Sequence, residues 1–312
     1  MEKDSILKWK EFYLQKDNNL RSWPDETLVR ILKGPYLSEY NLEFRDKKVL
    51  DVGFGNGESF IFLKSLGFQI YGTEVDESVC HKVQNDFEKL NIHVELTKGL
   101  NQRLPFPDNY FDYLISWNVL HYENNETDIL KGLAEYNRVL KPNGRMFLST
   151  TGPHHKILKN STKIENHIYL IGRDDDIRKG QIFYYFDSES EIRRVFSESF
   201  HNILVGRTQS NLFSEDELDW FLITATKNAI EVKTFILEFF AVKTNINTED
   251  LACTTNYFEM NYIDSLGIFE LISTLENEFQ CEFNENDFQD NSFSTINGLT
   301  KIIENKILKL QE

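Results

Sequence analysis

Two patterns of hydrophobic residues divide the chain. From about residue 47 to residue 227, short apolar runs alternate with stretches in which apolar residues recur every three or four positions. The short runs predict strands at 48–52, 69–72, 93–97, 111–116, 145–149, 202–207 and 220–226, and the longer periods predict helices at 59–66, 77–90 and 127–140. Pro142 and Gly144 end the last helix in a predicted turn. Such alternation is typical of parallel βαβ units, so we expect an α/β domain, preceded by helices within residues 1–46.

Residues 228–312 follow a different pattern. No alternating run predicts a strand there, and helical spacing predicts helices at 230–242, 265–280 and 296–310. The charge changes at the same point, because −10 of the formal net charge of −16 falls in these last 85 residues. We therefore expect two domains, residues 1–227 and residues 228–312, the second small and all-α.

Composition excludes several classes of function. The chain has 50 acidic and 34 basic residues. This excess of acidic residues argues against binding to nucleic acid or to an anionic membrane surface, because both need clustered cations. No uncharged apolar run approaches the length of a membrane span. Cys80, Cys253 and Cys281 are few and far apart, so we expect neither a disulfide framework nor a metal site. These features predict a soluble cytoplasmic protein without a metal.

A glycine-rich turn, Gly53-Phe54-Gly55-Asn56-Gly57, lies between the first predicted strand and the first predicted helix. Glycines let backbone N–H groups approach a ligand closely, and a helix N-terminus favours a negative group. Glu74 stands at the end of the next strand, where a carboxylate can accept the hydroxyl groups of a ribose. The residues themselves leave two interpretations open, a nucleotide-binding loop or a structural turn.

The arrangement Asp51-Val52-Gly53-x-Gly55-x-Gly57 resembles the class I S-adenosylmethionine-dependent methyltransferases. The stretches 104–112, 118–121 and 138–144 continue the resemblance, which covers roughly residues 20–227. It implies a Rossmann-like sheet of seven strands whose last strand is antiparallel. It also implies that Asp51, Gly53, Gly55 and Gly57 surround the methionine end of S-adenosyl-L-methionine and that Glu74 holds the ribose.

The resemblance is less complete at the adenine end. Many relatives carry an acidic residue for the adenine amino group, whereas this chain has Leu100 followed by Asn101. Either Asn101 or the backbone would then take that role. Asn118, in the stretch after the fourth predicted strand, completes the implied set of cofactor-binding residues.

Histidines follow two predicted strands at the edge of the sheet where ligands bind. Methyl transfer needs a base only if the acceptor begins protonated. His121 is the best-placed candidate for that base, and His154 and His155 follow the fifth strand. For each of them, ordinary packing or loop capping is the alternative.

The second domain contains Asp264-Ser265-Leu266 directly before an amphipathic helix. By themselves these residues predict a helix N-cap. With the flanking helices and the acidic loop they resemble acyl and peptidyl carrier proteins over nearly all of residues 229–312, which implies a small all-α domain of four helices. That resemblance implies that a phosphopantetheinyl transferase attaches 4′-phosphopantetheine to Ser265. It also implies partners that load acyl or aminoacyl groups or use them in later biosynthetic steps.

Three hypotheses about function follow from the two motifs. A methyltransferase could act on an acyl or aminoacyl group tethered to Ser265 of its own chain. It could instead methylate a free sugar or small metabolite, while the carrier domain delivers cargo to another enzyme. In a third hypothesis the first domain binds cofactor without catalysis, and only the carrier domain is active.

Overall fold

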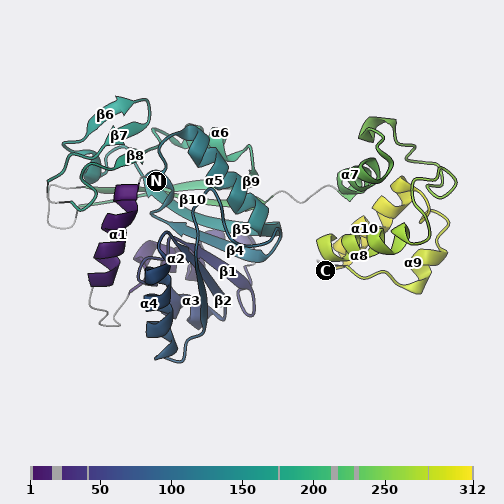
Figure 1. The fold of residues 1–312 in the computed structure, drawn as a ribbon, viewed down its shortest axis with the longest axis horizontal. Helices are drawn as coiled ribbons and strands as arrows, with labels where there is room; N and C mark the ends of the chain where they lie inside the picture. The colour runs from purple at the N-terminus through teal and green to yellow at the C-terminus, as the bar shows by residue number, and fades with distance from the viewer. Residues whose placement is uncertain are drawn as a thin grey trace. The chain divides into compact units, whose positions relative to one another are not determined.

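The computed structural model describes residues 3–15, 23–40, 42–174, 176–211, 217–227, 232–279 and 281–310. The chain divides into two compact units, Met1–Asn228 and Ala229–Glu312 (Figure 1). The expected domain boundary, between residues 227 and 228, borders residues 228–231, which lie outside the described residues.

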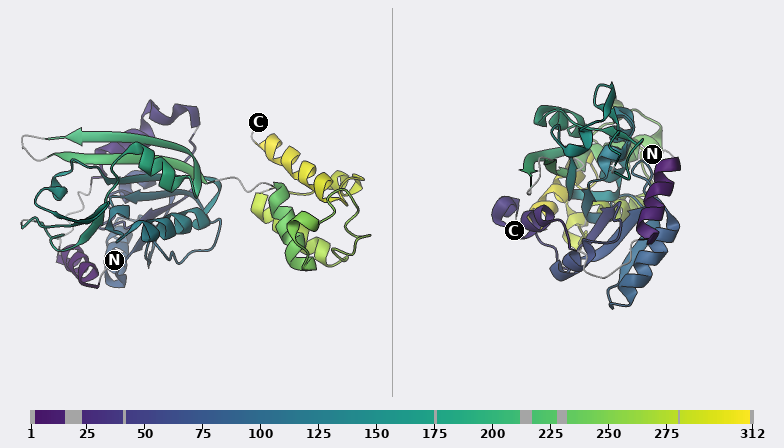
Figure 2. Two further views of the ribbon diagram at one scale, coloured as in Figure 1. Left: turned by 90° about the horizontal axis from the view of Figure 1, so that it is seen from above. Right: turned by 90° about the vertical axis from the view of Figure 1, so that its left-hand side faces the viewer.

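A seven-stranded sheet forms the centre of the first unit, in the order β3-β2-β1-β4-β5-β10-β9. Strands β1 to β5 run parallel to one another, and β10 is antiparallel to both of its neighbours, β5 and β9. The paired strands β9 and β10 are the long green arrows of Figure 2. The strands are β1 Lys48–Val52, β2 Gln69–Glu74, β3 Val94–Lys98, β4 Phe111–Trp117, β5 Leu140–Thr151, β9 Phe200–Ser210 and β10 Leu218–Lys227. The expected Rossmann-like sheet is confirmed.

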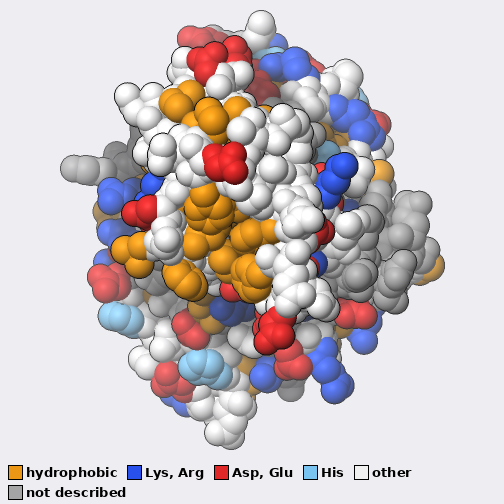
Figure 3. Space-filling model, turned by 90° about the vertical axis from the view of Figure 1, so that its right-hand side faces the viewer, with side chains coloured by type: hydrophobic (Ala, Val, Ile, Leu, Met, Phe, Trp, Pro, Cys, Tyr) orange, Lys and Arg blue, Asp and Glu red, His pale blue; other side chains and the backbone are white. Residues whose placement is uncertain are grey.

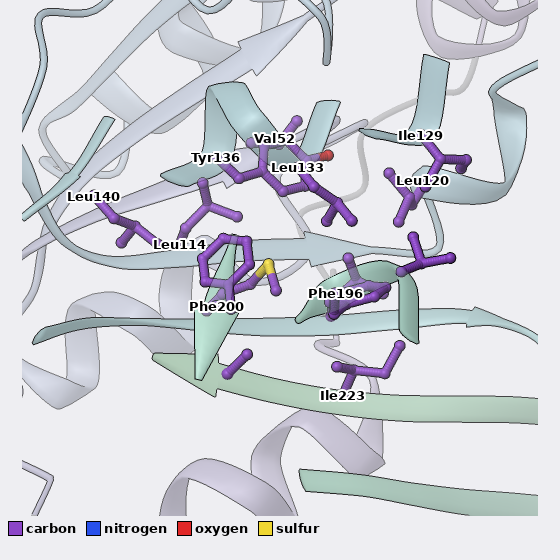
Figure 4. Close-up of a cluster of buried hydrophobic side chains, with 14 of the residues drawn as sticks. Val52, Leu114, Leu120, Ile129, Leu133, Tyr136, Leu140, Phe196, Phe200 and Ile223 are labelled. Atoms are coloured by element: carbon purple, nitrogen blue, oxygen red, sulfur yellow. The ribbon is translucent and has the colours of Figure 1, made fainter. Parts of the chain in front are cut away.

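Helices cover both faces of this sheet. One face carries α2 Glu26–Lys33, α3 Phe60–Leu66 and α4 Glu77–Glu88, and the other carries α5 Glu126–Val139 and α6 Glu189–Phe196. Side chains alternate between the faces along a strand, so Leu114 belongs to the core under α5 and α6 while Ile115 belongs to the opposite core. Figure 4 shows the first of these cores, where Leu114 and Ile223 of the sheet lie near Leu133 and Phe196.

Local signals explain where the helices begin and end. The side chain of Asp76 caps α4 by accepting the N–H of Ser78 at 2.9 Å. Gly67, with φ of 95°, ends α3. Helix α5 ends at Val139, before Pro142 as expected. Residues 141–144 are nevertheless part of β5, where the pairing with β4 shifts register, and do not form the separate turn that the sequence predicted.

Several elements of the first unit have no clear signal in the sequence. A separate three-stranded sheet lies between β5 and α6 in the chain, with β6 Thr162–Glu165, β7 Ile168–Leu170 and β8 Ile182–Tyr184. Its strands are short and β6 is exposed throughout, so no apolar alternation marks them. Helix α1 Lys3–Gln15, by contrast, is one of the helices expected within residues 1–46, and it packs beside α4. The short 3₁₀ helices are η1 Pro35–Tyr40, η2 Leu120–Tyr122 and η3 Lys156–Leu158.

Helices alone form the described part of the second unit, as expected for a small all-α domain. They are α7 Val232–Thr244, α8 Gly267–Phe279, α9 Glu285–Gln289 and α10 Ile296–Leu310, with a 3₁₀ turn η4 Thr248–Asp250. The core includes Ile236, Phe240, Leu271 and Leu299, which are fully buried. The helix expected at 230–242 begins at Ile230, and the helix expected at 265–280 ends at Gln280. Both of these terminal residues lie outside the described residues.

Candidate functional site

The glycine-rich turn after β1 can exist only without side chains at its first two glycines. Gly53 and Gly55 have φ values of 67° and 60°, in the left-handed region that favours glycine. A Cβ at Gly53 would lie 2.6 Å from a methyl carbon of Val119, and one at Gly55 would lie 2.9 Å from the phenol oxygen of Tyr13. The N–H of Gly53 donates to the carbonyl of Thr73 at 2.8 Å, which joins the turn to β2.

Two buried carboxylates lie beside this turn. Strands β1 and β2 pair with Asp51 opposite Gly72, which brings Asp51 near Glu74 at the end of β2. Burial raises the pKa of Glu74 to about 7, although hydrogen bonds from the N–H groups of Val75 and Gly55 favour its charged form and so oppose this shift. Burial, together with the charge of Glu74, raises the pKa of Asp51 to about 8. Such shifts are characteristic of functional sites.

The turn and the carboxylates line a cavity of about 660 Å³, a size common for ligand sites. Most of the residues expected to bind cofactor line it, namely Asp51, Gly53, Gly55, Glu74, Asn101 and Asn118, and so does His121. Gly57 is not among the lining residues. A Cβ there would meet ring carbons of Phe60 and Phe87 at 2.7 and 2.8 Å, so Gly57 lets the turn pack closely against α3 and α4.

Hydrogen bonds hold both asparagines of the expected set. The amide nitrogen of Asn101 donates to Glu123 at 2.7 Å, and its oxygen accepts the Tyr136 hydroxyl at 3.0 Å. The side-chain oxygen of Asn118 accepts the Ser149 hydroxyl at 2.6 Å. Asn101 is therefore held by hydrogen bonds with Glu123 and Tyr136, and its sequence context did not predict these partners.

Two other polar residues of the cavity were not singled out from the sequence. Asn56 and Thr73 are buried, and neither the amide of Asn56 nor the hydroxyl of Thr73 has a hydrogen-bond partner among the described residues. Buried polar groups are normally satisfied, so these atoms fit a polar ligand at the turn. Asn56 could have been found, because it lies between two glycines of the motif.

His121 lies in the cavity wall just after β4, with 1 % of its surface exposed. Its ring centroid is 4.6 Å from that of Tyr122 and 4.8 Å from that of Phe183. Burial, with the nearby charges of Arg178 and His155, holds the pKa of His121 well below its usual range. The imidazole is therefore neutral at pH 7, and its Nδ1 has no partner within the described part of the chain.

The other two histidines do not line the cavity. The Nδ1 atom of His155 accepts the N–H of Ile157 at 3.1 Å, and its ring packs on Trp220 with centroids 4.3 Å apart. The backbone N–H of His154 donates to Asp219 at 2.8 Å. Capping and packing account for His155, and His154 is exposed.

An aromatic wall, formed by Trp9, Tyr13 and Tyr122, closes one side of the cavity. Trp9 stacks on Tyr13 and meets Tyr122 edge to face, with centroids 5.4 and 5.5 Å apart. An ion pair of 3.1 Å between Lys10 and Asp76 attaches α1, which carries Trp9 and Tyr13, to the start of α4. The sequence did not predict this wall, because α1 and Tyr122 are more than a hundred positions apart.

In the second unit Ser265 is exposed two residues before α8. Asp264 caps this helix by accepting the N–H of Gly267 at 2.7 Å. The preceding loop is fastened to the core, since the buried Tyr257 donates its hydroxyl hydrogen to the carbonyl of Phe293 at 2.6 Å. The serine is thus accessible and held in a defined position.

Exposed hydrophobic side chains accompany the serine. Leu266 and Phe269 are 79 % and 69 % exposed. In the space-filling view of Figure 3, hydrophobic side chains gather in a patch on one face, with acidic side chains at its edge. Large exposed apolar side chains of this kind are typical of surfaces that meet other proteins.

One group of possible metal ligands lies outside the cavity. It comprises His167, Asp187 and Glu191. Both carboxylates already accept protein donors, because the Tyr185 hydroxyl donates to Asp187 at 2.5 Å and the N–H of Asp187 donates to Glu191 at 2.9 Å. None of the helices in the described part of the chain has the length and apolar character that a membrane crossing requires.

Comparisons with known families and structures bear on both units. Residues 49–144 match the methyltransferase domain family, and residues 234–303 match the phosphopantetheine attachment site family. An S-adenosylmethionine-dependent methyltransferase structure from Methanosarcina mazei has a TM-score of 0.52 at 19 % identity, covering 62 % of this chain and 99 % of that one. At this identity the likeness shows the fold alone.

Relatives by sequence are more limited in extent. An uncharacterised protein of Haemophilus influenzae is 36 % identical over 131 residues, which are 39 % of this chain and 51 % of that protein. The chain thus spans about half the length of that relative. A demethylmenaquinone methyltransferase of Staphylococcus saprophyticus is 29 % identical over 171 residues, 51 % of this chain and 72 % of that enzyme.

These matches identify the molecules that the two units use. The methyltransferase domain implies S-adenosyl-L-methionine, and the phosphopantetheine attachment domain implies a covalently bound 4′-phosphopantetheine. The chain thus contains a region that matches the methyltransferase domain family, followed by a region that matches the phosphopantetheine attachment site family.

Proposed function

We propose that this protein methylates an acyl or aminoacyl group carried as a thioester on the phosphopantetheine of its own Ser265. The observation that carries the proposal is that one chain combines the glycine-turn cavity with an exposed serine at a capped helix start. The proposed domains are residues 1–227 for methyl transfer and residues 228–312 for carrying the substrate.

The residues of the cavity would hold the cofactor in distinct ways. Gly53 and Gly55 allow close approach of the backbone, Glu74 accepts the ribose hydroxyls, and Asp51 lies at the methionine end. Gly57 supports the turn by packing. Asn101 positions Glu123 at the adenine end, and Asn118 lines the cavity after β4. The unpaired polar atoms of Asn56 and Thr73 support this assignment. S-adenosylmethionine supplies, when bound, the methyl group on its sulfonium.

His121 is the proposed base. An acceptor atom that begins with a proton must lose it on methylation, and His121 offers an unprotonated nitrogen in the wall of the same cavity. Exclusion of water by the surrounding aromatic side chains favours direct proton transfer from acceptor to imidazole.

Tethering is the physical advantage of joining the two units. An acceptor on a flexible arm of the same chain reaches the cavity at high effective concentration, so weak contacts to the acceptor suffice. A phosphopantetheinyl transferase first modifies Ser265, a loading enzyme adds the acyl or aminoacyl group, and a later enzyme removes the methylated product. We place this sequence of steps in the cytoplasm, where the free thiols of the three cysteines remain reduced.

Mass spectrometry of the protein from its own cells tests the proposal. The peptide that contains Ser265 is compared between the wild-type chain and Glu74→Ala. We expect the arm on both, with a larger share of the cargo lacking one methyl group in the variant. Identical cargo on both chains would contradict the proposal, as would an arm that is never loaded.

A free acceptor is the second candidate function. Its support is the similarity to an enzyme named demethylmenaquinone methyltransferase, whose name denotes a free small-molecule acceptor. If methylation proceeds equally well in a Ser265→Ala chain supplied with the free compound, this second function replaces the first.

A further inference from the structure

The cavity contains a charged pair that the proposed function has not used. Arg178 and Asp176 lie in the segment between β7 and β8, and both line the cavity. The Nε and Nη2 atoms of Arg178 donate to the two carboxylate oxygens of Asp176 at 2.6 and 2.5 Å. Both side chains are largely buried, at 21 % and 13 % exposure. This two-point contact neutralises the guanidinium locally.

The pair lies near His121 and Tyr122. Its guanidinium interacts with the hydroxyl of Tyr122, whose ring packs against His121, the proposed base. A guanidinium also has more N–H donors than one carboxylate accepts, so Arg178 retains donors for an oxygen of a bound molecule.

Acidic residues outnumber basic residues in the cavity wall. Among the described residues that line it, Arg178 is the only Lys or Arg side chain. The acidic side chains of the wall are Asp25, Asp51, Glu58, Glu74, Glu123 and Asp176. The basic side chain of the described wall, Arg178, is already paired with Asp176, so it is not free to balance the charge of an anionic acceptor. A neutral acceptor carries no charge that has to be balanced.

We propose that the Arg178–Asp176 pair is a subsite for a neutral carbonyl oxygen, so that the cavity binds an acyl group as a thioester and rejects the same group as a free carboxylate. The inference rests on the proposed function and names the charge class of its substrate. A thioester carbonyl accepts one hydrogen bond from Arg178 without disturbing Asp176. A carboxylate has to compete with Asp176 for the guanidinium and bring a further negative charge into a cavity whose wall already contains six acidic side chains.

The consequence is an order of events. Only cargo already loaded on the arm is neutral at its carbonyl, so loading precedes methylation. An acid set free by hydrolysis does not compete with the tethered substrate for the cavity.

Binding of two small probes to the full-length chain, saturated with S-adenosylhomocysteine, tests the subsite without requiring methyl transfer. The probes are butanoate and S-butanoyl-N-acetylcysteamine, with N-acetylcysteamine alone as a measure of binding through the thiol portion. Affinities are obtained by ligand-observed NMR titration. We expect the wild-type chain to bind the thioester at least about tenfold more tightly than butanoate, a difference of about 1.4 kcal/mol.

Two variants report on the pair. Asp176→Asn leaves Arg178 with an uncompensated charge and should shift the ratio of the two affinities about tenfold toward butanoate. Asp174→Asn is the matched control, because Asp174 lies in the same segment, is exposed and does not line the cavity. It should leave the ratio unchanged.

The inference is overturned if wild-type protein binds butanoate as tightly as the thioester, if Asp176→Asn leaves the ratio unchanged, or if neither probe binds. The first measurement needs no variant, so misfolding of Asp176→Asn does not remove the test. Failure of the subsite inference can be distinguished from failure of the proposed function. Carrier-dependent methylation without a preference between probes refutes only the subsite, and the preference without carrier-dependent methylation refutes only the tethered reaction.

Discussion

The two units hold their reactive groups in opposite ways. In the methyltransferase unit Asp51, Glu74 and His121 are buried in a cavity, and burial shifts the pKa of each. In the carrier unit Ser265 is exposed at the start of a helix. The first arrangement prepares an environment for chemistry, and the second presents an attachment point to other enzymes. Substitution of the carrier serine should therefore abolish attachment of the arm completely, whereas substitutions in the cavity should reduce the methylation rate or the cofactor affinity only in part.

The largest effect is expected at Ser265. Incubation of the full chain with coenzyme A and a broad-specificity phosphopantetheinyl transferase should add one arm to the wild type and none to Ser265→Ala, because the hydroxyl is the point of attachment. Intact-protein mass spectrometry measures the addition. Ser273→Ala, which changes another exposed serine on α8, is the control and should be modified normally. An unmodified wild type would exclude the carrier role.

The next effect concerns His121. With a loaded carrier, His121→Asn should slow methyl transfer about a hundredfold, the usual contribution of a positioned base, while S-adenosylmethionine affinity stays unchanged. Single-turnover kinetics and calorimetry separate the two quantities. His155→Asn alters a buried histidine outside the cavity and should affect stability more than rate. Equal rates for wild type and His121→Asn would show that no base is needed there.

A smaller loss is expected at Glu74. Glu74→Ala should weaken cofactor binding by ~1–3 kcal/mol, because a buried charged hydrogen-bonding partner of the ribose is removed. Isothermal titration calorimetry provides the value. Glu77→Ala, an exposed glutamate at the start of α4, is the matched control and should bind as the wild type does. If both variants bind equally, the ribose is held elsewhere.

The smallest effect is the dependence on pH. Burial raises the pKa of Glu74 to about 7 and, with the charge of Glu74, that of Asp51 to about 8. Cofactor binding favours the ionised carboxylates, so affinity should increase a few-fold from pH 6 to pH 8, with release of a proton. The same raised pKa values make the free energy of unfolding of the cofactor-free protein fall over that range, because the folded state binds more protons than the unfolded state. Calorimetry in two buffers measures the proton, and Glu74→Gln should flatten the profile.

Prediction from sequence succeeded where a local pattern determined the structure. The strands, the glycine turn and the place of Glu74 follow from the short apolar runs of β1 and β2 and from the rule that ligands bind at strand ends. The capped helix after Asp264 is equally local. The fold class of both units could be predicted for this reason.

The remainder of the cavity depends on contacts between distant parts of the chain. Trp9 reaches Tyr122 only because α1 packs beside α4. Arg178 belongs to a segment beside a small sheet without apolar periodicity, so nothing in its neighbours indicates a ligand. The hydrogen bond between Asn101 and Glu123 spans 22 positions. Periodicity describes the environment along one element and cannot predict such meetings.

The central claim is that the acceptor is bound to the carrier of the same chain. Full-length protein is loaded at Ser265 by the transferase with a panel of acyl- and aminoacyl-coenzyme A compounds and incubated with isotopically labelled S-adenosylmethionine. The cargo is then released and weighed. The account predicts label in at least one cargo on the arm and much less in the same group supplied free to Ser265→Ala. Faster labelling of the free compound than of the loaded chain would contradict it.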